Sequence, residues 1–103
     1  MNAYLDGLTP LIVAATSTED PEVVTTLLKA GANIEARDLQ YGVAALMWAA
    51  AHNPNPEVIT TLLKAGADAK AKSTEGKTAF YYAQLNLKLI DTDGYRNLRE
   101  ASK

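Results

Sequence analysis

The sequence predicts an all-α protein, a solenoid of stacked helix pairs, and three observations carry the prediction. A thirteen-residue word occurs twice, as "PEVVTTLLKAGAN" at 21–33 and as "PEVITTLLKAGAD" at 56–68. The same shift of 35 residues relates Leu11 to Leu46 and Ala14 to Ala49. Helix-capping residues precede each copy of the word, and a glycine lies near its end. A period in the thirties is typical of solenoids, in which each unit packs only on its neighbours.

The first helix of each unit is expected to begin after Thr9, Ala44 and Thr78. Thr9 precedes Pro10, which is a capping side chain followed by proline at the first helical position. Thr78 repeats the cap, whereas Ala44 has no side-chain acceptor. The second unit should therefore have the weaker helix start, by about 1 kcal/mol.

The second helix of each unit opens on Asp20-Pro21-Glu22 and on Asn55-Pro56-Glu57. Each triplet places a capping side chain, a proline and an acid at the positive end of the helix dipole. Gly31 and Gly66 end these helices. The apolar stripe is wide, so we expect neighbours on two sides; it comprises Val23, Val24, Leu27 and Leu28, and then Val58, Ile59, Leu62 and Leu63.

The openings of the three units read "DGLTPLIVAA", "YGVAALMWAA" and "EGKTAFYYAQ". Together with the repeated word, they resemble the ankyrin repeat. "TPLIVAA" at 9–15 matches the T-P-L-H-x-A signature of that family, with Ile12 at the histidine place. The resemblance covers roughly residues 5 to 86. It implies helix-turn-helix units joined by short β-hairpin fingers, and a non-catalytic, protein-binding function.

On this basis residues 1–103 form a single ankyrin repeat domain. The first repeat spans about 7–41, the second about 42–75, and a divergent C-terminal cap unit about 76–103. The finger after Gly31 is one residue longer than the finger after Gly66, so we expect it to bulge at its tip. Asp91, Thr92 or Asp93 is expected to cap a last helix that turns Tyr95 and Leu98 inward.

No earlier repeat in the sequence covers the apolar stripe of the first unit. We therefore expect Val24 and Leu28 to form a self-association face, through which two copies would pair as a homodimer. Structural self-assembly is accordingly the alternative to partner binding. The near-identity of the two units also leaves open an engineered or truncated ankyrin scaffold.

Composition excludes several functions. The net charge of −2 argues against a nucleic-acid partner. No apolar run is long enough to span a membrane, so no membrane partner is expected. The absence of cysteine removes disulfides, thiolate metal sites and a cysteine nucleophile. The chain shows no signal peptide, which favours a cytoplasmic location.

No catalytic residue, cofactor or metal is predicted. His52 is the only histidine, and an exposed residue at a helix end is its simplest interpretation. "DTDG" at 91–94 has the look of a calcium loop, but the register puts Leu89 at the first ligand position. Helix capping accounts for this segment better.

The resemblance implies that the position after the signature histidine faces a concave groove, and here it holds Val13, Trp48 and Tyr82. Tryptophan and tyrosine are frequent anchors of protein interfaces, although semi-buried packing is the alternative for both. The predicted partner-binding residues, on the groove and the fingers, are Tyr4, Leu39, Tyr41, Met47, Trp48, His52, Tyr81 and Tyr82.

Overall fold

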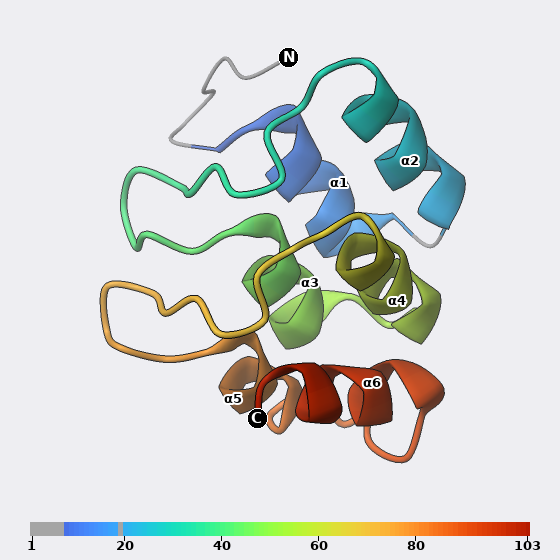
Figure 1. The fold of residues 1–103 in the computed structure, drawn as a ribbon, viewed down its shortest axis with the longest axis vertical. Helices are drawn as coiled ribbons and strands as arrows, with labels where there is room; N and C mark the ends of the chain where they lie inside the picture. The colour runs from blue at the N-terminus through green and yellow to red at the C-terminus, as the bar shows by residue number, and fades with distance from the viewer. Residues whose placement is uncertain (1–7, 19) are drawn as a thin grey trace.

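The computed structural model describes residues 8–18 and 20–103, and the helices within them form two columns (Figure 1). One column contains α1 (Pro10–Ser17), α3 (Ala45–His52) and α5 (Ala79–Ala83). The other contains α2 (Pro21–Lys29), α4 (Pro56–Lys64) and α6 (Asp93–Ala101). Each helix packs on its pair partner and on its neighbours in the same column. The predicted all-α solenoid is confirmed.

The predicted capping residues begin the helices. Thr9 Oγ1 accepts the backbone N–H of Ile12 at 3.2 Å, and Thr78 Oγ1 accepts that of Tyr81 at 3.4 Å. Ala44 makes no side-chain cap, as its sequence predicts. In the second column the capping side chains belong to Asp20, Asn55 and Thr92.

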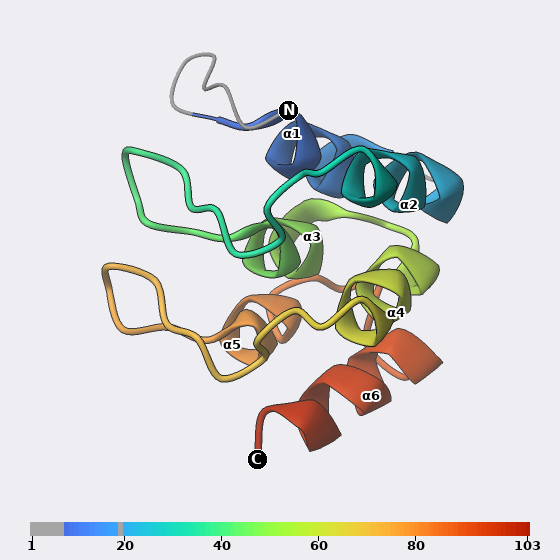
Figure 2. The same ribbon diagram turned by 45° about the horizontal axis from the view of Figure 1, so that its top comes forward.

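Two loops project from the first column, residues 31–44 as the first finger and 66–78 as the second (Figure 2). The expected β-hairpins do not form in the described residues of the fingers, where an isolated antiparallel bridge joins Arg37 and Ala44. The reason lies at the tip of the first finger. There the Asp38 carboxylate accepts the backbone N–H groups of Gln40, Tyr41 and Val43, at 3.1, 2.7 and 2.6 Å. These bonds build a turn in place of a strand ladder.

The extra residue of the first finger lies at this tip, as predicted. Asp38 N donates to Val43 O at 3.1 Å, and Ser73 N donates to Lys77 O at 2.9 Å at the equivalent place of the second finger. The first closure spans one residue more than the second. Gly42, at the end of this turn, has a φ of +64°, and a Cβ there would lie 2.5 Å from Thr74 Oγ1 of the second finger.

A buried asparagine joins the second unit to the first. Asn53 is fully buried, and its Nδ2 donates to the carbonyl oxygens of Ala15 at 2.8 Å and Thr18 at 2.7 Å. These carbonyls lie at the C-terminal end of α1, where the last carbonyl groups of a helix generally lack intrahelical donors. Asn53 Oδ1 accepts the backbone N–H of Asn55 at 2.8 Å, so the side chain also shapes the entry to α4.

Asn86 repeats this arrangement between the second unit and the third. Its Nδ2 donates to Ala50 O at 3.1 Å and Asn53 O at 3.0 Å, at the end of α3. Its Oδ1 accepts the backbone N–H of Lys88 at 3.2 Å. The sequence pattern did not predict that Asn53 and Asn86 connect adjacent units.

The open face of the first unit is made by residues other than those predicted. Val24 is fully buried, and Leu28 is half-buried beside a groove between α2 and α4. The assignment of Val24 to a self-association face is therefore wrong, because this valine points into the core, as its counterpart Ile59 does.

Comparison of equivalent positions identifies the residues that a preceding unit would cover. The relevant positions are exposed or half-buried in the first unit but fully buried 35 residues later. The apolar residues among them are Pro10, Ala14, Val23 and Leu27, with the counterparts Ala45, Ala49, Val58 and Leu62. These four residues of the first unit are called the open face below.

Helices α5 and α6, in the segment predicted as a cap unit, pack on the other side of the second unit. Thr92 Oγ1 accepts Tyr95 N at 3.2 Å, so Thr92 is the capping residue among the three candidates. Leu98 is fully buried, and the Tyr95 ring packs on Phe80 with centroids 5.2 Å apart. Gly94 allows α6 to approach α4, because a Cβ there would lie 2.5 Å from Pro56 O. The outward residues are Arg96, Arg99, Glu100 and Lys103, which gives the cap its polar surface.

Replacing Asn53 with alanine should lower the free energy of unfolding by about 2–4 kcal/mol. The variant removes three hydrogen bonds and takes the amide donor away from one buried and one part-buried carbonyl group at the end of α1. Urea unfolding followed by circular dichroism measures the change. The matched control is Asn97→Ala on the exposed side of α6, which should shift stability by about 0.5 kcal/mol or less. Equal effects of the two substitutions would contradict this role.

Candidate functional site

A cavity of about 480 Å³ opens between α3, α5 and the two fingers. Its floor and one wall come from α3, its other wall from α5, and its rim from the fingers. The lining is mostly apolar and aromatic, as in most ligand pockets; it consists of Tyr41, Val43, Met47, Trp48, Ala51, His52, Ser73, Glu75, Tyr82 and Leu85. We call this cavity the groove.

Helix α3 supplies the central part of the groove. Trp48 and His52 lie one helical turn apart, and their rings stack with centroids 5.6 Å apart at a tilt of 35°. Trp48 is half-buried and packs against the core, whereas His52 is exposed at the end of the helix, as predicted. In the described part of the chain, Trp48 Nε1 is the buried side-chain polar atom without a hydrogen-bond partner.

Helix α5 supplies the second wall through Tyr82. The hydroxyl groups of Tyr82 and Ser73 are hydrogen-bonded at 2.9 Å, which fixes the tyrosine ring against the second finger. Tyr81 packs edge-on against Tyr82 with centroids 5.5 Å apart, but it lies outside the groove. The Lys77 ammonium group lies over the Tyr81 ring, 4.6 Å from its centroid.

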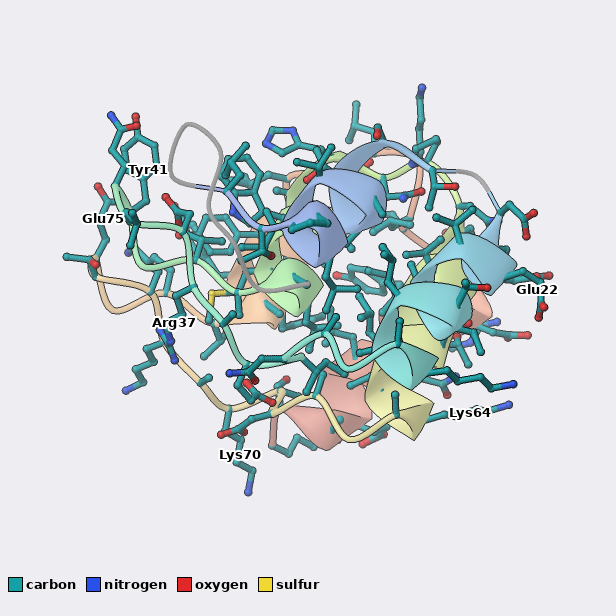
Figure 3. The ribbon with its side chains drawn as sticks, turned by 90° about the horizontal axis from the view of Figure 1, so that it is seen from above. Glu22, Arg37, Tyr41, Lys64, Lys70 and Glu75 are labelled. Carbon is teal, nitrogen blue, oxygen red and sulfur yellow. The ribbon has the colours of Figure 1, made fainter. Side chains whose placement is uncertain are left out.

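The fingers are fixed to one another by hydrogen bonds between units. Thr74 N donates to Tyr41 O at 3.2 Å, and Arg37 Nη1 donates to Gly42 O within its own finger and to Lys72 O of the next. Figure 3 shows Tyr41 and Glu75 at the far ends of the fingers, with Arg37 nearer the helices. A rim held in this way loses little conformational freedom when a ligand binds.

Five of the predicted binding residues line the groove: Tyr41, Met47, Trp48, His52 and Tyr82. Met47 is only 1% exposed, so its prediction as a surface contact is corrected to a position in the floor of the groove. Leu39 is 71% exposed but lies on the first finger away from the lining, as Tyr81 does on α5. Tyr4 lies outside the described residues.

Sequence reasoning missed the other half of the lining: Val43, Ala51, Ser73, Glu75 and Leu85. The available signal was the repeat itself. Ala51 follows Trp48 by three residues and so shares its helix face. Ser73 lies in the second finger at the place that Asp38 has in the first. Glu75 lies at the tip of the second finger, near the place of the tip residues of the first.

Helical pairs stacked in two columns, with fingers projecting beside a concave groove, define the class of helical-repeat proteins. The family model for the ankyrin repeat matches residues 6–39 and 41–74, which together are 68 of the 103 residues. The chain therefore belongs to the ankyrin repeat family, whose members are typically non-catalytic and generally mediate protein–protein interactions. No curated protein matches the chain.

The described residues contain no group of three or more histidine, cysteine or acidic side chains able to hold a metal ion. None of the helices in this part of the chain is long and apolar enough to cross a membrane. In the calcium-loop register of residues 91–94, the first ligand position is Leu89, which is fully buried, and Asp91 has a φ of +69°.

Millimolar calcium or zinc should therefore leave the melting temperature unchanged. A specific site in the native state would raise it by mass action, and chelator would reverse the increase. Differential scanning fluorimetry with and without EDTA measures the shift. Magnesium serves as the control for ionic strength, and a rise of several degrees specific to one metal would overturn the expectation.

Proposed function

We propose that this chain is a non-catalytic module that binds another protein through the groove and the fingertips beside it. The observation that carries the proposal is the convergence of Tyr41, Trp48 and Tyr82 on one cavity. These residues come from three different elements, the first finger, α3 and α5. Large, rigid aromatic side chains in a partly desolvated pocket provide much of the binding energy at protein interfaces.

Two further features support the proposal. Hydrogen bonds between the fingers hold the rim in place, so binding needs little reorganisation. Glu75 is the acidic side chain in the lining, and a carboxylate repels the phosphates of a nucleic acid.

A random peptide library displayed on phage tests the proposal without a known partner. Binders selected on the parent protein should lose about tenfold or more in affinity against Tyr41→Ala and against Trp48→Ala. Tyr41 is 51% exposed, so its replacement should leave stability within about 0.5 kcal/mol and gives the cleaner result. The control is Leu87→Ala, which alters a residue that is 83% exposed and outside the groove. Binders that tolerate both groove substitutions but not the control would refute the groove as the site.

The second candidate is self-association through the open face, and the exposure comparison between units favours it. Val23 is 41% exposed, whereas its counterpart Val58 is fully buried by the stacking of units. Stacking on the first unit buries Val58, whereas Val23 keeps its exposure in the described residues. A second copy of the same face offers an apolar cover of equal shape about a two-fold axis.

Val23→Lys should abolish a dimer that the parent forms at high concentration, because it places a charge at the centre of the interface. Val13→Lys is the matched control, since Val13 is 49% exposed on the groove side of α1. Light scattering against concentration measures the mass of each protein. A parent that stays monomeric throughout, or a dimer that survives Val23→Lys, eliminates this candidate.

A further inference from the structure

The charge and the rings of the groove define the chemistry of what it binds. Three aromatic side chains and one carboxylate line the same cavity: Tyr41, Trp48, Tyr82 and Glu75. The faces of aromatic rings carry negative charge density and attract cations, most strongly at tryptophan. The carboxylate adds a full negative charge at the rim.

Glu75 is available for a partner. It is exposed on the second finger, and the ion pairs found in the described residues, Arg96–Asp93 and Lys103–Glu100, both lie in the cap unit. Among residues 8–18 and 20–103, no lysine or arginine lines the groove. Arg37, the arginine of the first finger, donates instead to the backbone of both fingers.

Rings of α5 already attract a cation within this chain. The Lys77 ammonium group lies 4.6 Å from the centroid of Tyr81, whose ring is packed edge-on against Tyr82. Tyr81 lies outside the groove lining, so Lys77 does not occupy the ring of Tyr82, while the indole of Trp48 is in contact with the His52 ring.

Resting on the proposed function, we infer that the groove recognises an arginine side chain presented by an extended segment of the partner protein. A planar guanidinium group stacks on aromatic faces and donates two parallel hydrogen bonds to a carboxylate. The methylene stem of the arginine would lie along the apolar lining, which Val43, Met47 and Leu85 provide. Lysine offers the charge without the planar stacking surface, so it should bind more weakly.

The test uses the single tryptophan as a reporter inside the groove. Acetylated pentapeptides of the form Gly-Gly-X-Gly-Gly-amide, with X as arginine, norleucine or glutamate, are titrated into the 15N-labelled protein. The indole Nε1–H signal of Trp48 gives each affinity. Arginine should bind about three- to tenfold more tightly than norleucine, which has a comparable stem and no charge, and glutamate should bind least.

Variants locate the preference. Glu75→Gln should reduce the ratio of arginine to norleucine affinity to about twofold or less, and Tyr41→Ala should weaken the arginine peptide. Glu57→Gln is the matched control, because it removes an exposed acid from the first turn of α4 and should leave the ratio unchanged. A ratio that is insensitive to Glu75→Gln would overturn the assignment of the carboxylate.

The outcomes separate this inference from the proposed function. Phage-selected binders that depend on Tyr41 and Trp48 but carry no arginine at a common position would overturn the arginine specificity and leave protein binding intact. The arginine specificity would also be overturned, with protein binding left intact, if norleucine bound as tightly as arginine or if no pentapeptide shifted the indole signal. A library that yields no groove-dependent binder would remove the proposed function itself.

Discussion

The length of the helices is the constraint on which the rest of this structure depends. The described helices have nine residues or fewer, and α5 has only five. Isolated helices of this length are marginal in water because nucleation costs more than so few hydrogen bonds return. Each one therefore persists only while neighbours bury its apolar face. The result is a stack whose stability depends on contacts between adjacent units.

The buried asparagines add direction to this stacking. Apolar contacts between α1 and α3 tolerate some sliding, since burial depends on area and hardly on orientation. The amide groups of Asn53 and Asn86 do not tolerate such sliding, because each must reach two carbonyl groups at the end of α1 or of α3. These bonds set the register of one unit on the next, and the fingers that line the groove follow from that register.

The repeat made most of the fold predictable from the sequence. Thr9, Asp20 and Asn55 predicted the helix starts because helix capping depends only on residues close in the sequence. The groove was half predictable, because aromatic residues at equivalent repeat positions pointed to it. Ser73, Glu75 and Leu85 became part of it only through the approach of the second finger and α5, which no local pattern encodes.

The open face shows the limit of the same reasoning. The pairs Val23–Val24 and Leu27–Leu28 look alike in the sequence, and a stripe of adjacent apolar residues does not say which member faces a neighbouring unit. Rotation of α2 about its axis decides it, and packing against α1 and α4 sets that rotation. The exposure of Val23 and the burial of Val24 are therefore properties of the assembled stack.

Trp48 joins the stability of the stack to the groove. The indole packs on the core while its ring contributes to the cavity, so one residue serves both parts. Its Nε1–H group has no hydrogen-bond partner among the described protein residues. The same side chain therefore couples the packing of α3 to the shape of the groove, which makes Trp48 the link between the fold and the proposed site.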